Sequence, residues 1–298
     1  MKKRIHTTTS RTAEWTCTSR AASAVEKRKQ YNCEDDIALL LVPRFVKIFL
    51  KISVLRRFFT KFAAPEGLYE YVIARTKYID NEFKKALNEQ FDQILIFGAG
   101  FDTRAVRFQA AACNTEIFEL DVPITQNAKI KQFRKRGVKI PGNLHFIAID
   151  FDKDSLPHKL DQAGFKKNRK TLFILEGLLM YLQPESVNET FKLIHTYSGE
   201  KSRIVFDYIY ASVLRQENLY YGEKGAFDSV AKAGEAWSFG IEMDEIGTFL
   251  SKYHLILLDH KNSRDLQKSY FLDANKRPVG RVNGTHCLVT AETNRLKM

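Results

Sequence analysis

The chain has 298 residues, of which 44% are hydrophobic and 28% charged, with only 15 glycines and 7 prolines. These values exclude a mostly disordered chain and fit one large domain, or one domain with an accessory element. The formal net charge is +12, and residues 1–61 hold fourteen lysines and arginines against five acids. The basic surplus therefore belongs to the N-terminal segment and not to the whole surface.

This basic segment is compatible with several partners. It can attract nucleic acid, anionic lipid or an acidic substrate, or it can form the solvated side of a helix, which we favour. Six cations interrupt its most apolar stretch, residues 39–62, and exclude a transmembrane segment. We expect a helix packed on the main domain with its basic side in water, with a basic amphipathic helix on a membrane surface as the alternative. No aromatic-basic motif indicates specific nucleic-acid binding.

The cysteines and the N-terminus bear on location and metals. Cys17, Cys33, Cys113 and Cys287 are far apart and form no Cys-x-x-Cys pair. This spacing does not support a zinc site, and we expect no metal. The basic start of the chain is followed by polar residues and not by the apolar stretch of a signal peptide. We therefore expect a protein of the reducing cytoplasm.

In chain order, the first elements are helical. Residues 12–29 are rich in helix formers, Pro43 interrupts the next apolar helical stretch near its start, and residues 68–88 carry an apolar side at three- and four-residue spacing. Pro65-Glu66-Gly67 marks a turn or a helix start before the last of these helices. We expect an N-terminal helical cap over residues 1–89.

From residue 90 to 298, short apolar runs alternate with segments of helix length. The expected strands are residues 93–97, 115–120, 143–149, 171–175, 203–208, 254–258 and 286–291. Strands that alternate with helices predict an α/β fold with a mostly parallel sheet. The last two strands, joined by a polar loop with little helical signal, predict an antiparallel terminal strand in a seven-stranded sheet. A helical lid is expected near residues 210–240.

A glycine turn follows the first strand directly, at Gly98-Ala99-Gly100. Glycine there allows a tight turn and lets a ligand approach the backbone closely. Thr103 stands where the dinucleotide fingerprint has its third glycine, which weakens the interpretation as a nicotinamide site. An ordinary strand-to-helix turn is the alternative.

Acidic residues close the next three strands. Asp121 ends the second strand and can accept hydrogen bonds from ribose hydroxyls, a role for which we prefer it to Glu119. Asp150 with Phe151 closes the third strand and can hold an adenine ring. Glu176 lies among apolar residues after the fourth strand, where a carboxylate needs a cationic ligand or an internal Arg or Lys.

Five segments together resemble the leucine carboxyl methyltransferase family, which contains many bacterial enzymes that methylate small molecules. They are Thr12-Ala13 with Arg20-Ala21, Asp35-Asp36-Ile37-Ala38, residues 98–104, residues 118–123 and residues 176–182. The resemblance spans about residues 10 to 290. It implies a Rossmann-like methyltransferase fold and S-adenosyl-L-methionine as the cofactor.

The resemblance also implies roles for single residues. Gly98 and Gly100 would border the methionine part of the cofactor, and Glu176 would lie near its amino group. Asp121 would hold the ribose, and Asp150 with Phe151 the adenine. Arg75 would pair with the cofactor carboxylate, and Arg20 would assist it. Without the resemblance, we would read Arg75 as a solvated charge on a helix.

The methyl acceptor is less clearly indicated. Tyr208, at the end of the fifth strand, is a candidate acceptor-site residue, and no residue stands out as a catalytic base. We predict O-methylation of a small molecule at a carboxylate, which needs no base, or at a phenolic hydroxyl, which does. A protein C-terminal carboxylate is the alternative acceptor. An NAD-dependent oxidoreductase and a basic protein that binds nucleic acid or a membrane surface are the alternatives of other classes, and the oligomeric state is open.

Overall fold

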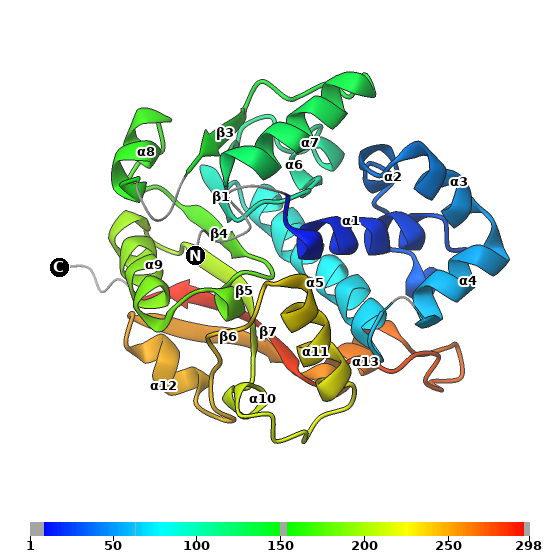
Figure 1. Ribbon diagram of the computed structural model, residues 1–298. Coiled ribbons are helices and arrows are strands. Elements are labelled where there is room, and N and C mark those ends of the chain that lie inside the picture. Colours follow the sequence, from blue (N-terminus) through cyan, green and yellow to red (C-terminus); the bar gives the residue numbers. More distant parts are fainter. Residues whose placement is uncertain (1–8, 63, 150–153, 295–298) are drawn as a thin grey trace.

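A seven-stranded sheet organises the computed structural model, which describes residues 9–62, 64–149 and 154–294 (Figure 1). The strand order is β3-β2-β1-β4-β5-β7-β6. Strands β1 to β5 pair in parallel, and β7 pairs antiparallel with β5 and β6, which confirms the predicted sheet. The strands are β1 (Gln93–Phe97), β2 (Glu116–Asp121), β3 (Leu144–Ala148), β4 (Thr171–Leu175), β5 (Arg203–Ile209), β6 (Leu255–Lys261) and β7 (His286–Thr293).

Helices cover both faces of this sheet (Figure 1). They are α1 (Arg11–Ala24), the 3₁₀ helix η2 (Lys29–Tyr31), α2 (Ala38–Leu41), α3 (Arg44–Lys51), α4 (Ser53–Phe62), α5 (Leu68–Asn88), α6 (Arg104–Arg107), α7 (Pro123–Lys135), α8 (Leu156–Gln162), the 3₁₀ helix η3 (Leu179–Tyr181), α9 (Pro184–Tyr197), α10 (Ala211–Leu214), α11 (Glu223–Ala233), α12 (Ile246–Ser251) and α13 (Ser263–Tyr270). Helices α1, α2, α5, α6, α7 and α13 share one core with the sheet, and α8, α9, α11 and α12 share the other.

The central strands are apolar on both sides because both of their faces are covered. In β1, Ile94 and Ile96 belong to the core that contains α5, whereas Leu95 and Phe97 belong to the core that contains α9. The helices before residue 89 thus share their core with the sheet. The division into a cap over residues 1–89 and a domain over residues 90–298 stays a prediction.

Two helical expectations need correction. Helix α1 ends at Ala24, earlier than the expected residue 29. The connection between β6 and β7, expected to have little helix, contains α13. Asn262 caps α13 by accepting hydrogen bonds from the N–H groups of Arg264 and Asp265, and the Asp265 side chain accepts from the Asn262 N–H. This capping box ends just before Leu266, a pattern that is visible in the sequence and typical of a helix start.

The start of α5 depends on a glycine. Gly67 has φ +70°, and a Cβ there would lie 2.5 Å from the backbone N of Asn283 and 2.7 Å from the carbonyl O of Arg281. Since Gly67 N-caps α5 and its carbonyl accepts from the Asn283 N–H at 2.9 Å, this contact ties α5 to the segment before β7.

We expect Gly67→Ala to lower the free energy of unfolding by at least about 1 kcal/mol, because a left-handed backbone alone costs a residue with a Cβ about 1–2 kcal/mol. Urea unfolding followed by circular dichroism measures it. Gly142→Ala is the matched control, since a Cβ on Gly142 meets nothing within 4 Å. Equal stability of the two variants would contradict the role of this contact.

Candidate active site

A cavity of about 1090 Å³ lies at the carboxyl ends of β1, β2 and β4, next to α1 and α5 and the segment after α11. In open α/β sheets ligands bind at this edge. Six residues predicted to bind the cofactor line this one cavity: Arg20, Arg75, Gly98, Gly100, Asp121 and Glu176. The structure therefore brings together residues that lie more than 150 positions apart in the chain.

The glycine turn and Asp121 form one unit. Gly98 has φ +58° and Gly100 has φ +50°, a region that glycine adopts without steric cost. The Asp121 carboxylate accepts hydrogen bonds from the backbone N–H of Gly100 and, at 2.6 Å, from that of Val122. Burial raises the pKa of Asp121, and these two N–H groups oppose the rise. The turn thus holds a carboxylate at the cavity wall.

Glu119, which precedes Asp121 by two residues in β2, has different neighbours. It is buried, and the Lys129 Nζ lies 2.6 Å from its carboxylate. Burial raises the pKa of Glu119 to about 7, although Lys129 lowers it. Glu119 is therefore engaged by a lysine of α7, and Asp121 is the acid of β2 that lines the cavity.

Three other predicted site residues are not placed in this cavity. Asp150 and Phe151 lie outside the described residues, so their proposed contact with adenine stays a prediction. The Tyr208 side chain is buried in the core on the α9 side of the sheet, with its hydroxyl 3.1 Å from Nε2 of His260. Side chains alternate along a strand, and the preceding residue, Asp207, faces the site instead.

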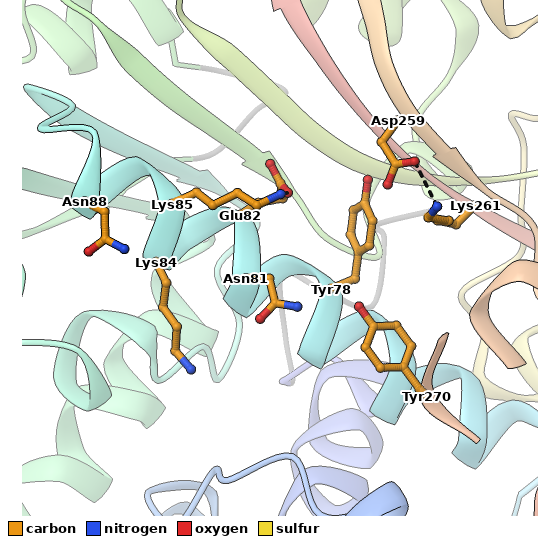
Figure 2. Close-up of a pocket in the computed structure, with 9 residues that line it drawn as sticks. All are labelled: Tyr78, Asn81, Glu82, Lys84, Lys85, Asn88, Asp259, Lys261 and Tyr270. Carbon is orange, nitrogen blue, oxygen red and sulfur yellow. Dashed lines mark hydrogen bonds and ion pairs between the residues drawn. The ribbon is translucent and has the colours of Figure 1, made fainter. Parts of the chain in front are cut away.

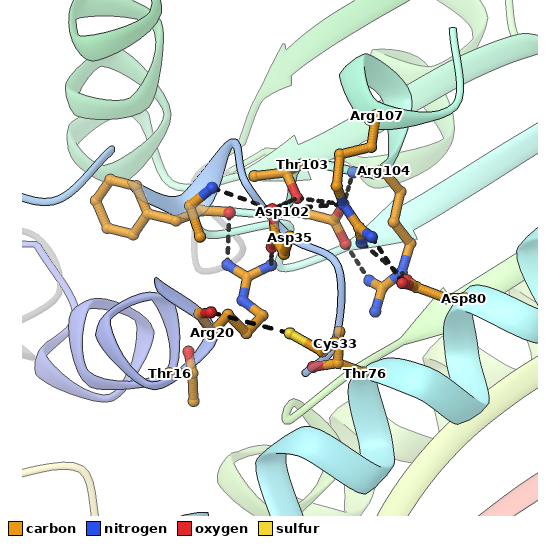
Figure 3. A network of polar contacts seen from close by, with 12 residues as sticks. Thr16, Arg20, Cys33, Asp35, Thr76, Asp80, Asp102, Thr103, Arg104 and Arg107 are labelled. Atoms are coloured by element: carbon orange, nitrogen blue, oxygen red, sulfur yellow. Dashed lines mark hydrogen bonds and ion pairs between the residues drawn. The ribbon is translucent and has the colours of Figure 1, made fainter. Parts of the chain in front are cut away.

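A chain of ion pairs runs beneath the cavity, from α1 to β5, and Figure 3 shows its first part. Neighbouring groups lie 2.7–3.4 Å apart. In order, its members are Arg20, Asp35, Arg107, Asp80, Arg104, Glu176, Arg75 and Asp207. Asp102 adds a branch, with its carboxylate paired to Nη1 of Arg104 and bound to the Arg104 N–H at 2.7 Å.

The charges of this ionic chain do not cancel. Four arginines face five carboxylates, so the fully charged chain has a formal charge of −1. Arg104 is fully buried, and Asp35 and Asp207 are too. Among its acids, Glu176 has a side chain 16% exposed and lines the cavity. A cation in the cavity next to Glu176 would therefore complete the balance of charge.

Arg75 and Glu176 pair directly at the cavity, which Arg20 and Asp102 of the ionic chain also line. Nε of Arg75 lies 3.0 Å from Glu176, and Nη1 lies 2.8 Å from Asp207. Burial alone would raise the pKa of Glu176, but Arg104, Arg75 and Arg20 together lower it to about 2. Glu176 is thus a carboxylate at neutral pH. The Asp207 carboxylate also accepts from the Gly177 N–H at 2.5 Å and from the Tyr71 hydroxyl at 2.7 Å.

Aromatic residues and one histidine line another part of the cavity. The His286 ring stacks on Tyr71 with centroids 4.3 Å apart and meets the Trp237 ring edge-on at 5.4 Å. Burial, with a smaller effect of Arg75, lowers the pKa of His286 to about 3. The imidazole is therefore neutral at physiological pH.

Hydrogen bonds define which His286 nitrogen carries the proton. The Asn283 Nδ2 donates to the Glu66 carbonyl at 2.9 Å, so Asn283 Oδ1 accepts from the Thr285 hydroxyl at 2.6 Å. With its only hydrogen used, Thr285 Oγ1 accepts from Nδ1–H of His286 at 2.6 Å. This tautomer places the lone pair on Nε2 of a side chain that lines the cavity.

The segment after α11 closes the cavity against the start of α1. The Glu235 carboxylate accepts from the Ser10 hydroxyl at 3.1 Å and from the N–H groups of Arg11 at 2.9 Å and Thr12 at 3.3 Å. An acid at a helix N-terminus is stabilised by the unpaired N–H groups and the helix dipole. The predicted lid region thus contributes to the cavity through a defined contact.

A second, shallower hollow of about 360 Å³ lies between α5, β6 and α13 (Figure 2). Its charges mostly pair with one another: Lys85 lies 2.6 Å from Glu82, and Lys261 lies 3.1 Å from Asp259. No group of three or more His, Cys, Asp or Glu side chains within residues 9–62, 64–149 and 154–294 is arranged to hold a metal ion. The large cavity is therefore the candidate active site.

Sequence reasoning missed several residues of this site. Asp102 and Arg104 belong to a quoted motif, yet the pairing of Arg104 with Glu176 joins residues that lie 72 positions apart in the chain. Asp80 and Asp207 belong to no motif. Each is a charged residue in an apolar segment, and such a residue is expected to have a buried partner of opposite charge. His286 opens the last strand, and only the fold brings it beside Tyr71.

Comparison with known proteins identifies the family of the chain. The family model described as leucine carboxyl methyltransferase matches residues 13–195, more than half of the chain. The chain belongs to the leucine carboxyl methyltransferase family. Its relatives include YktD of Bacillus subtilis, provisionally named as an S-adenosyl-L-methionine-dependent methyltransferase, which is 28% identical over 211 residues covering 71% of this chain and 69% of that protein.

Other relatives match a shorter part. A Mycobacterium marinum protein with the same provisional description is 32% identical over 138 residues, which cover 46% of this chain and 44% of that protein. A solved methyltransferase structure from Thermobifida fusca superposes with a TM-score of 0.57 at 15% identity, over 93% of this chain and 94% of that one. The fold is accordingly the Rossmann-like methyltransferase fold, and the chain is an S-adenosylmethionine-dependent methyltransferase.

In this member of the leucine carboxyl methyltransferase family, we expect Arg104→Met to lower the free energy of unfolding by about 3–5 kcal/mol, since it leaves buried carboxylates unpaired. Chemical denaturation measures the change. Arg215→Met is the control, because Arg215 pairs with Glu217 and Glu242 at the exposed surface and its loss should change stability far less. An equal decrease in the free energy of unfolding in both variants would show that the buried ionic chain stabilises the protein no more than a surface ion pair does.

Proposed function

We propose that this methyltransferase transfers the methyl group of S-adenosylmethionine to a hydroxyl oxygen of a small molecule. One observation carries the proposal: a single cavity joins the glycine turn, Asp121 and the Arg75–Glu176 pair to an aromatic wall with a neutral histidine. The glycine turn, Asp121 and the Arg75–Glu176 pair suit a nucleoside that carries an amino acid part. The aromatic wall with its histidine suits an apolar acceptor that carries a hydroxyl.

The residues present fit the cofactor. Gly98 and Gly100 would border its methionine part, where side chains with a Cβ would narrow the cavity. The Asp121 carboxylate would accept from the ribose hydroxyls. The ionic chain lacks one positive charge, which matches the net charge of a cofactor with an ammonium, a sulfonium and a carboxylate, and we place the ammonium at Glu176. Arg75 would pair with the cofactor carboxylate, with Arg20 assisting.

When bound, S-adenosylmethionine supplies a methyl group that leaves its sulfonium sulfur for the acceptor oxygen, and the sulfur keeps the electron pair of the broken bond. A hydroxyl acceptor also has to lose its proton. Nε2 of His286 accepts a hydrogen bond from this hydroxyl and takes the proton as the new C–O bond forms. The low pKa of His286 makes it a weak base, so its main contribution is to orient the oxygen.

The same histidine favours a hydroxyl over a carboxylate. An ionised carboxylate has no hydrogen to donate to the Nε2 lone pair, and two acceptors that face each other repel. Tyr71, Trp237 and Val230 add an apolar wall that suits a ring or an alkyl chain. A phenol or an alcohol on an apolar skeleton therefore matches this wall better than an acid does.

The cover over the cavity favours a small acceptor over a protein terminus. Glu235 joins the segment after α11 to the first turn of α1, so both elements lie over the site. This segment is also tied to the loop after β4, because the Ser238 N–H donates to the Met180 carbonyl at 2.7 Å and the Ser238 hydroxyl donates to the Leu182 carbonyl at 2.8 Å. A polypeptide chain would have to displace these contacts.

Asp121→Ala should weaken the binding of S-adenosylhomocysteine by about 1–3 kcal/mol, because the ribose hydroxyls and the N–H groups of Gly100 and Val122 lose their acceptor. Isothermal titration calorimetry gives the affinity. Asp92→Ala is the matched control, since Asp92 lies next to the other end of β1 and accepts from the Lys170 N–H at 2.9 Å. A folded Asp121→Ala protein with unchanged affinity removes Asp121 from the site.

The acceptor class is tested with a lysate of the source organism and cofactor labelled in its methyl group. We expect the label to enter a low-mass organic fraction and to resist mild alkali, because a methyl ether is stable where a methyl ester releases methanol. Label that stays with protein and is released by alkali would instead show a C-terminal carboxyl acceptor. Alkali-labile label in the low-mass fraction would show a small carboxylate and overturn the hydroxyl assignment.

A further inference from the structure

Helices α3 and α4 expose an apolar surface, which we call the cap face. Its members are Phe45, Ile48, Ile52, Val54, Phe58 and Phe62, each between 48% and 74% exposed. The spacing of these residues, three or four apart within each helix, places them along one side of α3 and one side of α4. Soluble proteins rarely expose so many large apolar side chains together, and such a patch indicates an interaction surface.

The opposite sides of the same helices are anchored. Leu50 is fully buried, and Val46, Phe49 and Phe59 pack against the core. The Arg56 Nε lies 2.7 Å from Glu26, and Arg56 Nη1 donates to the Leu50 carbonyl at 2.9 Å. Sequence analysis favoured a helix with its apolar side packed and its basic side in water. The structure shows instead that only some of the apolar residues of α3 and α4 pack against the core, while the others are exposed.

Cations surround the cap face without acidic partners. Residues 44–62 contain six lysines and arginines and no aspartate or glutamate. Arg56 is paired, and the remaining five form no ion pair with any residue in the part of the chain that the structure describes: Arg44, Lys47, Lys51, Arg57 and Lys61. The lysines of the shallower hollow, in contrast, mostly lie beside acids. The cap face therefore has an uncompensated positive charge.

The positive charge and the apolar surface of the cap face together indicate which kind of partner it can bind. A second copy docked through the same face would bring ten uncompensated cations together. None of the helices in the described ranges is long and apolar enough to cross a membrane. An amphipathic helix that lies on a bilayer inserts its apolar side chains at the level of the headgroups, while its lysines and arginines meet anionic lipids. The cap face has both of these features.

We propose that the cap face docks the protein on an anionic membrane surface. Phe45, Ile48 and Phe58 would insert below the headgroups, and Lys51 and Arg57 would bind lipid phosphates. The site is separate from the cavity, so docking leaves the proposed chemistry as it is. An apolar acceptor that resides in the bilayer would be brought close to the enzyme in this way.

Vesicle flotation tests the proposal with the full chain. We expect binding to vesicles of phosphatidylcholine with phosphatidylglycerol, much weaker binding to pure phosphatidylcholine, and a loss of binding as salt rises from about 50 to 500 mM, because exposed charges are screened. No flotation with either vesicle, or equal flotation with both, would overturn the proposal.

Variants of the cap face separate lipid docking from protein docking. Phe58→Glu and Lys51→Glu should each lower the partition coefficient about fivefold or more. Met243→Glu and Lys252→Glu are matched controls at exposed positions outside the cap face and should bind as the parent protein does. Circular dichroism confirms folding. Parent-like flotation of both cap-face variants overturns the assignment, and so does a dimer in light scattering that Phe58→Glu dissociates.

Discussion

The buried ionic chain from Arg20 to Asp207 is the constraint on which the rest of the structure depends. A buried charge without a partner is strongly destabilising, so each buried guanidinium needs its carboxylate partners in the folded structure. The partners come from α1, the segment after η2, α5, the glycine turn with α6, the loop after β4 and strand β5. The helical cap and the sheet are therefore built around one polar core, and the cavity lies directly above it.

Much of the fold could be predicted from the sequence because its signals are local. Helix α5 has the predicted bounds, Leu68–Asn88, since its apolar residues recur at helical spacing and a glycine turn precedes it. Alternation of strands and helices likewise predicted the parallel sheet. Helix α13 was missed because its apolar content is low, although its capping box was present. The bounds of β1 and β4 match the prediction. Some ends of the other strands differ by one to three residues, because hydrogen bonding with a neighbouring strand sets them and a single strand's pattern does not contain it.

The residues of the candidate site likewise divide into those that local sequence patterns predict and those that depend on tertiary contacts. Gly98 and Gly100 lie in the turn directly after β1, and Asp121 ends β2, so their place at the sheet edge follows from the order of elements. Tyr208 and Asp207 show where prediction from the sequence is limited. A difference of one residue along a strand places a side chain on the other face of the sheet. The pairing of Asp35 with Arg107 and the approach of His286 to Tyr71 depend on tertiary packing. No spacing in the sequence records such contacts.

The most direct test of the account is a crystal structure with S-adenosylhomocysteine bound. The ligand carboxylate should lie within hydrogen-bonding distance of Arg75, its amino group beside Glu176, and its ribose hydroxyls on Asp121, with the ionic chain otherwise intact. The account is contradicted if Arg75 and Glu176 bind only each other and Asp207 while the ligand lies elsewhere, or if the ribose has no contact with Asp121. Either result would separate the buried charges from the cofactor and leave them a purely structural role.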